Sequence, residues 1–268
     1  MVMVFEGTEN QYSMDGYHKT NLDRAKKVIK QDWDMVFVYD GMEGSGKSVK
    51  AQQDAFYCDP TLNIDRITFN PDDFRDQVMQ SQKYQAVVYD EAYGGLSSKS
   101  AMQKVNKTIV QMLTVIREKN LFIFIVLPSF HDLTKYVALW RSRALVHVYT
   151  KQFQRGFFAF YNKDKKKDLY VHGKKFYSYN IPRPNFIGRF TNHYTVDEQE
   201  YRHKKSKTSN IIEDHRPTPA QIQKKVQKDI VLSIRHNNPK KTITDIAKDL
   251  GVTRQTIHNY LKEKNKLT

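Results

Sequence analysis

The sequence predicts an α/β fold with a parallel sheet flanked by helices, followed by a basic β-hairpin region and a small C-terminal domain of three helices. Three observations lead to this prediction. Short apolar runs typical of buried parallel strands alternate with helical segments through the first 150 residues. A glycine-rich loop directly follows the first of these runs. Residues 217–268 instead carry apolar side chains at helical spacing, interrupted by a single glycine.

Strands are expected at the short apolar runs of the first half. These runs cover residues 35–39, 66–69, 86–89, 121–127 and 144–149. Helices are expected between them, over residues 22–31, 45–56, 71–82 and 101–117. Asn70 is placed to cap the third helix and Pro71 to occupy its first turn. Because strands that alternate with helices pair in parallel, the pattern predicts one continuous parallel sheet.

The pattern changes after residue 150. Residues 156–161 and 169–172 flank the segment NKDKKKD, which predicts a β-hairpin with a basic tip. Residues 181–216 are rich in proline and charge, and they are expected to form an extended basic connector. The predicted organisation is therefore a domain over residues 1–180, the connector, and a second domain over residues 217–268.

The net charge of +15 lies entirely in the second half of the chain. Residues 1–150 contain 18 basic and 18 acidic residues, so the whole excess falls in residues 151–268. Lysine and arginine gain affinity for nucleic acid by releasing counterions from its phosphates. This division predicts a neutral catalytic domain joined to a region that binds a polyanion. The alternative is a basic surface that only keeps the protein in solution.

Composition excludes several classes of protein. A chain of 268 residues with 39% apolar residues can bury a core, so wholesale disorder is excluded. The longest apolar run, residues 121–127, is far shorter than the roughly 20 residues that cross a bilayer. The N-terminus has no signal-peptide pattern, so we expect a cytoplasmic protein. Cys58 is the only cysteine, which excludes an internal disulfide and a thiolate-rich metal site.

Residues 41–48, GMEGSGKS, match the phosphate-loop pattern G-x-x-x-x-G-K-[ST]. An apolar strand precedes the match and a helical stretch follows it, which directs free backbone N–H groups at a phosphate. Lys47 is predicted to reach the β- and γ-phosphates of ATP, and the Ser48 hydroxyl to hold Mg²⁺. The predicted nucleotide-binding residues are Gly41, Gly44, Ser45, Gly46, Lys47 and Ser48. The alternative is a glycine-rich surface turn.

Two acidic residues follow the apolar run at 86–89. Asp90 is predicted to hold the metal together with Ser48, and Glu91 to activate the attacking water. An aspartate at the end of a strand also caps turns, which is the simpler alternative for Asp90.

These residues resemble the additional-strand, catalytic-glutamate class of P-loop ATPases. Residues 35–150 look like the FtsK/HerA group of DNA-pumping motors, which includes zonula-occludens-toxin-type proteins of viruses and mobile elements, although only residues 41–48 and 90–91 are specific. The resemblance implies a sheet in which the strand at 121–127 lies between the strands leading to Lys47 and Asp90. It also implies ring-shaped homo-oligomers and translocation of DNA.

The same resemblance suggests further catalytic residues. Many members end the central strand with a glutamine, whereas this chain has Pro128 and Ser129, so Ser129 is a candidate sensor of the γ-phosphate. Ser129 also suits the cap of a following helix. Ring ATPases complete their site with an arginine from the neighbouring subunit, and the candidates are Arg117, Arg141 and Arg143. The simpler alternative for each of these arginines is a charge at the surface or at the end of a helix.

Residues 242–263 have the spacing of a helix-turn-helix. Apolar residues face inward from both helices, and Gly251 suits the left-handed residue that ends the first. The outward residues are of the types that contact DNA in a major groove: Arg254, Gln255, His258, Asn259 and Lys262. Such a module can instead bind protein. The basic tip at 163–167, with Lys165 and Lys166, is a second candidate DNA contact, or else a solvated turn.

Taken together, these features predict an ATP-hydrolysing, oligomeric motor that moves duplex DNA during packaging or transfer. The competing prediction is an ATP-switched DNA-binding regulator, or a loader for replication or transposition. A terminase-type packaging ATPase would need a cluster of carboxylates for its nuclease, and residues 151–268 show none. A small-molecule kinase is disfavoured by the basic C-terminal region.

Overall fold

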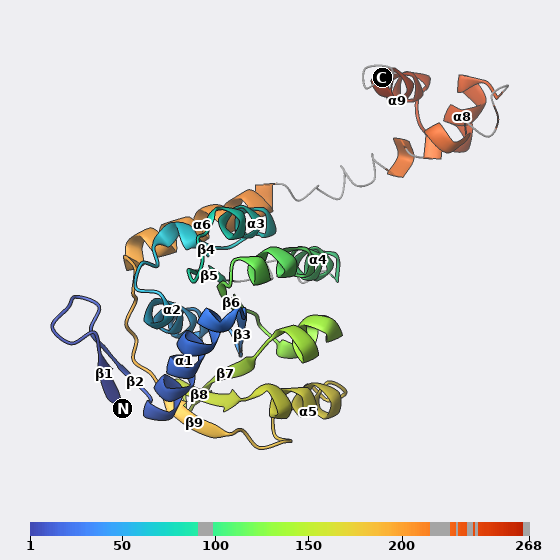
Figure 1. Ribbon diagram of the computed structural model, residues 1–268. Coiled ribbons are helices and arrows are strands. Elements are labelled where there is room, and N and C mark those ends of the chain that lie inside the picture. The colour runs from blue at the N-terminus through green and yellow to red at the C-terminus, as the bar shows by residue number, and fades with distance from the viewer. Residues whose placement is uncertain (91–98, 215–225, 229, 235–237, 239–240, 265–268) are drawn as a thin grey trace. The chain divides into compact units, whose positions relative to one another are not determined.

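The computed structural model describes residues 1–90, 99–214, 226–228, 230–234, 238 and 241–264. The chain divides into two compact units, Met1–Ile212 and Glu213–Thr268. Each unit has its own core and is described by itself below (Figure 1). Among the described residues, none of the helices combines the length and apolarity that a membrane span requires.

The first unit is built on a seven-stranded sheet with the order β4-β5-β6-β3-β7-β8-β9. The strands are β3 (Met35–Asp40), β4 (Ile67–Thr68), β5 (Ala86–Tyr89), β6 (Phe122–Val126), β7 (Ala144–Lys151), β8 (Gln154–Tyr161) and β9 (Phe186–Arg189). The pairings from β4 through β7 are parallel, and β8 and β9 join in antiparallel fashion. The expected position of the strand at 121–127, between the strands that lead to Lys47 and Asp90, is confirmed.

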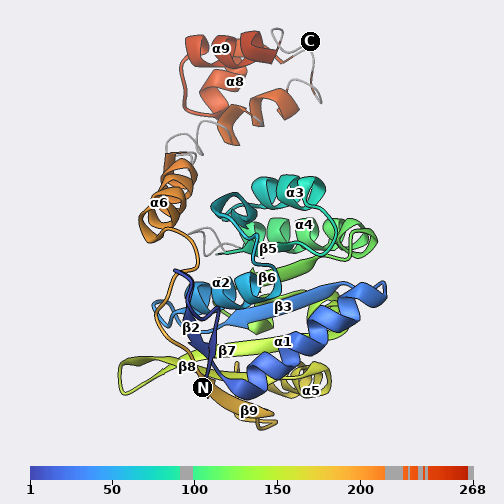
Figure 2. The ribbon, with the colours of Figure 1, turned by 60° about the vertical axis from the view of Figure 1, so that its left-hand side comes forward.

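Helices cover both faces of this sheet. They are α1 (Gly16–Val28), α2 (Lys47–Cys58), α3 (Pro71–Gln80), α4 (Lys99–Glu118), α5 (Lys163–Gly173) and α6 (Glu198–Asp214). Figure 1 shows α1 and α2 on one side of the sheet and α4 and α5 on the other. A separate two-stranded ribbon of β1 (Val2–Val4) and β2 (Tyr12–Met14) precedes α1 (Figure 2). The prediction of an α/β unit with a mostly parallel sheet is therefore confirmed.

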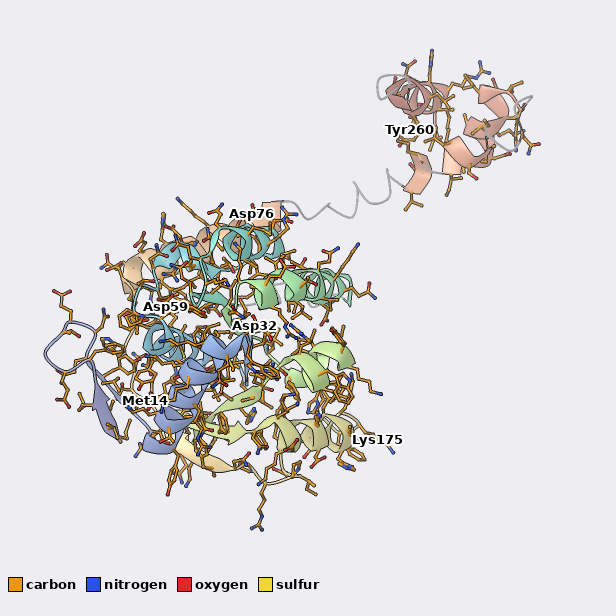
Figure 3. All side chains as sticks on the ribbon, viewed as in Figure 1. Met14, Asp32, Asp59, Asp76, Lys175 and Tyr260 are labelled. Atoms are coloured by element: carbon orange, nitrogen blue, oxygen red, sulfur yellow. The ribbon has the colours of Figure 1, made fainter. Side chains whose placement is uncertain are left out.

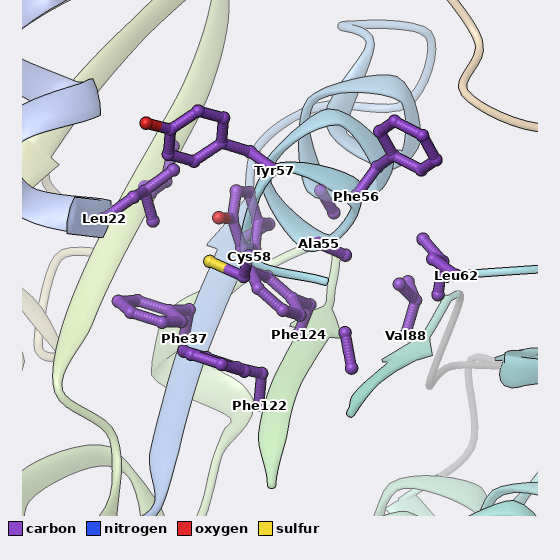
Figure 4. Close-up of a cluster of buried hydrophobic side chains, with 14 of the residues drawn as sticks. Leu22, Phe37, Ala55, Phe56, Tyr57, Cys58, Leu62, Val88, Phe122 and Phe124 are labelled. Carbon is purple, nitrogen blue, oxygen red and sulfur yellow. The ribbon is translucent and has the colours of Figure 1, made fainter. Parts of the chain in front are cut away.

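Two apolar cores lie on opposite faces because strand side chains alternate. In β3, Phe37 and Tyr39 belong to the core under α1 and α2, whereas Val36 and Val38 belong to the core under α3, α4 and α5. Figure 4 shows the first core around Phe37, where this ring stacks on Phe124 at 5.4 Å between centroids. Both faces of the parallel part of the sheet are therefore covered by apolar side chains and helices.

The hairpin prediction for residues 156–172 is wrong. The hairpin is formed by β7 and β8, and its tip at Gln152 and Phe153 adopts positive φ angles of 50° and 62°. Residues 163–173 form helix α5, capped by Asn162, whose Oδ1 accepts a hydrogen bond from the Lys165 N–H. The buried residues of α5 are Lys166, Leu169, Tyr170 and Gly173, which follow helical spacing. The short run 169–172 showed too few residues to separate this spacing from that of a strand.

The extended connector predicted for residues 181–216 is also wrong over much of its length, where the structure has a strand and a helix. Residues 186–189 add strand β9 to β8, and residues 198–214 form helix α6. Asp197 caps α6 by accepting a hydrogen bond from the Glu200 N–H at 2.7 Å. The polar composition of α6 hid it in the sequence, because a helix with few apolar residues shows no continuous apolar stripe.

The second unit contains α8 (Ile243–Asp249) and α9 (Arg254–Lys264). Its core includes Val231, Ile246, Ile257 and Tyr260, and Tyr260 is labelled in Figure 3. Gly251 between the helices has a φ of 62°, the left-handed conformation expected at the end of the first helix. Binding of DNA by this unit stays a prediction.

Candidate functional site

The loop at residues 41–46 lies at the carboxyl end of β3, where the sheet meets the N-terminus of α2. Three glycines in it have positive φ angles: 136° at Gly41, 74° at Gly44 and 96° at Gly46. A Cβ atom at Gly41 would lie 1.9 Å from the carbonyl oxygen of Val148, so no side chain fits there. Gly46 forms the N-cap of α2. The loop therefore wraps closely and leaves the first N–H groups of α2 directed outward.

Lys47 and Ser48 are the first two residues of helix α2 and directly follow the loop. The Lys47 ammonium group donates a hydrogen bond to the Met42 carbonyl oxygen at 2.9 Å, which places the cation across the loop. The Ser48 hydroxyl donates to Oδ1 of Asp90 at 2.9 Å. Asp90 follows β5 and is fully buried, and its own N–H donates to the Thr68 carbonyl oxygen. The residues predicted for phosphate and metal binding are thus brought together from two strands of the sheet.

A cavity of about 570 Å³ opens beside the loop. Residues 43–44 and 46–49 form one wall, and residues from β8, from the segment after β9 and from α6 form the other. The charged side chains among the described residues of its lining are Glu43, Lys47, Arg155, Arg202 and Lys205, so cations exceed anions by four to one. A cavity with this charge attracts a polyanionic ligand.

The segment at residues 190–197, which we call the strap, fixes the second wall against α2. The Gln53 side-chain amide donates to the carbonyl oxygens of Thr191 at 2.7 Å and His193 at 2.9 Å. The Phe190 N–H donates to the Gly156 carbonyl oxygen at 2.9 Å. The Phe190 ring lies close to Gly46, 3.1 Å from where a Cβ atom would be. The strap is therefore held in place by α2, the helix that also carries Lys47 and Ser48.

Tyr201, on helix α6, is the main site residue that the sequence did not reveal. Its hydroxyl donates to Oδ2 of Asp90 at 2.5 Å, and only 3% of the residue is exposed. Burial, and next the charge of Asp90, raise the pKa of Tyr201, which keeps the phenol protonated as a donor. A lone tyrosine within the polar stretch 198–210 was the only available signal.

Ser129 acts as a cap in the structure. Its hydroxyl oxygen accepts a hydrogen bond from the His131 N–H at 3.3 Å, at the start of the short 3₁₀ helix Phe130–Asp132. The Phe130 N–H donates to Oδ2 of Asp40 at 2.9 Å, which ties this turn to the end of β3. A role of Ser129 as γ-phosphate sensor stays a prediction.

The three candidate arginines lie around the amino end of β3, whereas the phosphate loop follows its carboxyl end. Arg141 and Arg143 both pair with Asp34, at 2.6 and 3.5 Å. The guanidinium groups of Arg143 and Arg117 lie over the ring of Trp33, at 4.7 and 6.0 Å from its centroid. Each candidate therefore has contacts within its own chain, and action on a neighbouring subunit stays a prediction.

The assignment of Lys166 to DNA contact is wrong. Its side chain is fully buried, and its ammonium group donates to the carbonyl oxygens of Ala138 and Leu139. The neighbouring Lys165 is half-buried and donates to the Pro184 carbonyl oxygen at 3.2 Å. The basic segment opens helix α5, so one of its lysines points into the protein.

The C-terminal candidates share an exposed face of α9. Arg254, Gln255, His258 and Asn259 are exposed, while Ile257 and Tyr260 turn inward. The Gln255 amide donates to the Asn259 side chain at 3.3 Å. The side chain of Lys262 lies outside the described residues, and so does the whole of Glu91, the predicted water activator.

Comparison with solved structures gives a weak likeness to a domain of another protein. The N-terminal domain of zonular occludens toxin from Neisseria meningitidis resembles this chain with a TM-score of 0.32 and 14% sequence identity. The likeness covers 48% of this chain and 84% of that one. No protein-family model matches the sequence, and no curated protein does. The fold assignment rests instead on the strand order and loop geometry described above.

Proposed function

We propose that this protein binds and hydrolyses ATP with Mg²⁺ at residues 41–48, and uses the energy to move duplex DNA as an oligomeric motor. The observation that carries the nucleotide part is the hydrogen bond from Ser48 to Asp90. Ser48 lies in the first turn of α2 and Asp90 directly follows β5, and the two side chains converge beside a glycine-rich loop that ends in Lys47.

The residues at the loop fit a nucleoside triphosphate with its magnesium ion. A serine hydroxyl and a carboxylate oxygen are the hard oxygen ligands that Mg²⁺ prefers, with the phosphates completing its shell. Gly41 packs directly against the backbone of β7, where a Cβ atom would collide with the Val148 carbonyl oxygen, and this close approach fixes the start of the loop. The adjoining cavity, at about 570 Å³, has the size of a small-molecule site.

The chain's own residues would divide the chemistry among them. Lys47 would bind the β- and γ-phosphates and offset their negative charge, while the N–H groups at the start of α2 hold them in place. Ser48 and Asp90 would hold the magnesium ion, which stabilises the charge that develops on the phosphate oxygens. Glu91, directly after Asp90, would orient and deprotonate the attacking water.

The proposed link to DNA rests on charge and on the second unit. The entire net charge of +15 lies after residue 150, and Arg254 and His258 are exposed on α9. A helix with such side chains can enter the major groove of duplex DNA, which is a polyanion. A homo-oligomeric ring is the assembly in which repeated ATP hydrolysis moves a duplex along one path.

Steady-state ATP hydrolysis, measured with and without duplex DNA, tests the proposal. We expect hydrolysis that DNA stimulates several-fold in the wild type and that Glu91→Gln abolishes without loss of ATP binding. Glu118→Gln, at an exposed glutamate near the end of α4, is the matched control and should hydrolyse ATP normally. Absence of hydrolysis would overturn the proposal. Hydrolysis without DNA stimulation, combined with ATP-dependent DNA affinity, would support the DNA-binding regulator instead.

A further inference from the structure

The Asp90 carboxylate is held through both of its oxygens by hydroxyl groups from different parts of the chain. Ser48 donates to Oδ1 at 2.9 Å, from the first turn of α2. Tyr201 donates to Oδ2 at 2.5 Å, from a helix that begins more than a hundred residues later. Because the two donors engage opposite oxygens, they fix the plane of the carboxylate as well as its position.

Tyr201 is itself held in place by its surroundings. Its ring packs against Phe69 and Tyr194, each at 5.5 Å between centroids. One turn further along α6, the Lys204 ammonium group donates to the carbonyl oxygens of Ile64 and Ile67, both at 2.8 Å. These contacts anchor α6 to the segment that leads into β4. The phenol is therefore a preorganised donor rather than a mobile surface group.

The hydrogen bonds from Ser48 and Tyr201 orient the Asp90 carboxylate, which is the proposed ligand of the magnesium ion. Residues that donate a hydrogen bond to a metal ligand orient that ligand. Their removal typically lowers metal affinity about 10- to 100-fold. Tyr201 is placed to do this for Asp90, since its hydroxyl occupies Oδ2 and leaves Oδ1 beside Ser48. Arg202, the next residue of α6, lines the same cavity as Lys47. Helix α6 thus contacts the Asp90 carboxylate through Tyr201 and lines the cavity with Arg202.

We infer that Tyr201 is a positioning residue for the magnesium ion: it holds Asp90 in the orientation in which Asp90 and Ser48 bind the metal together. This inference rests on the proposed binding of ATP and Mg²⁺ at residues 41–48. It makes helix α6, which leads toward the second unit, part of the nucleotide site.

The test compares nucleotide affinity with and without the metal. A fluorescent ATP analogue is titrated into the full-length protein in Mg²⁺ and again in EDTA, and the ratio of the two affinities gives the enhancement by Mg²⁺. We expect Tyr201→Phe to lower this enhancement about 10-fold or more while leaving the affinity in EDTA unchanged within about twofold. Tyr57→Phe is the matched control, because Tyr57 donates to Asp23 at the same 2.5 Å but lies outside the cavity lining. Its enhancement should equal that of the wild type.

Each outcome of this titration decides one question. An enhancement in Tyr201→Phe equal to that of the wild type overturns the inference and leaves the proposed function standing. Failure of the wild type to bind the analogue at all overturns the proposed function itself. Circular dichroism checks the folding of each variant. If Tyr201→Phe does not fold, Tyr201→Met lacks the same hydroxyl, fills the space with a flexible side chain and carries the same expectation. Failure of both to fold while Tyr57→Phe folds would show a purely structural bond and overturn the inference.

Discussion

Arg141 donates a hydrogen bond of 2.6 Å to Asp34, at the end of β3 opposite to the phosphate loop. The Asp34 carboxylate is 2% exposed and also pairs with Arg143 at 3.5 Å. One buried carboxylate therefore pairs with both Arg141 and Arg143, which were candidates for catalysis in a neighbouring subunit.

We expect Asp34→Ala to lower the free energy of unfolding by about 2 kcal/mol. Breaking a fully buried pair costs about 3 to 5 kcal/mol, and the loss is smaller here because both guanidinium groups keep some contact with water. Urea unfolding followed by circular dichroism measures the change. Asp76→Ala, at an exposed ion pair with Arg75, is the control and should change stability by less than about 0.5 kcal/mol. Equal stability of both variants would contradict the structural role of Asp34.

Lys47→Ala should abolish nucleotide binding. The substitution removes the cation that lies across the loop while leaving the loop backbone and its glycines intact. Isothermal titration calorimetry with an ATP analogue and Mg²⁺ gives the affinity directly. Lys83→Ala, at an exposed lysine outside the cavity lining, should bind as the wild type does. Retained binding in Lys47→Ala would mean that the phosphate site has been placed wrongly.

Lys166 should make the stability of the protein depend on pH. Burial, and then the neighbouring charges of Lys167, Lys163 and Arg143, lower the pKa of Lys166 from its ordinary 10.5 to about 7 in the folded protein. Between these two pH values the unfolded chain binds one more proton than the folded chain. Stability therefore rises with pH across this window, and the full cost of the buried charge is present below pH 7.

Comparison with Lys166→Met isolates this effect from other titrating groups. We expect the stability of the wild type relative to the variant to rise by about 2 kcal/mol between pH 7.5 and pH 9.5, since the largest slope is about 1.4 kcal/mol per pH unit. Urea unfolding at each pH provides the measurement. A difference that stays constant with pH would show that the lysine keeps its ordinary proton affinity inside the protein.

Removal of residues 217–268 should weaken binding of duplex DNA and spare basal ATP hydrolysis. The second unit has its own core, so its loss leaves the two cores of the first unit unchanged. Fluorescence anisotropy with labelled duplex DNA, over a range of salt concentrations, measures the affinity. In the intact chain, Arg254→Ala should cost about 1 to 3 kcal/mol of binding free energy if the arginine contacts a base. Unchanged DNA affinity after the removal would point to a protein partner for this unit.

The parts of the fold that could be predicted from the sequence are those determined by short stretches of neighbouring residues. The central strands β5 and β6 are buried along their whole length, so each appears in the sequence as an unbroken apolar run. The loop at residues 41–48 was found because its spacing follows directly from the geometry of phosphate binding. The convergence of Ser48 and Asp90 then follows from the parallel order of their strands.

The parts that escaped prediction depend on contacts between distant segments. Lys166 looked solvated within a basic run, and only its helix and the carbonyl groups of Ala138 and Leu139 account for its burial. Tyr201 stands alone in a polar stretch, and its partner Asp90 lies 111 residues earlier. A single sequence contains no local pattern that joins a hydroxyl to a carboxylate over such a distance. The β-hairpin was misplaced because its turn, at Gln152 and Phe153, carries none of the usual turn residues.

Strand β9 bears on how the protein can be divided for experiments. It has only four residues and forms the outer edge of the sheet, where a short strand limits pairing with other chains. A fragment that stopped at residue 180 would lose β9, and the unpaired edge of β8 could then pair with strands of other molecules. The same fragment would also lack the strap and Tyr201. A recombinant fragment of the first unit should therefore extend through Ile212, where that unit ends.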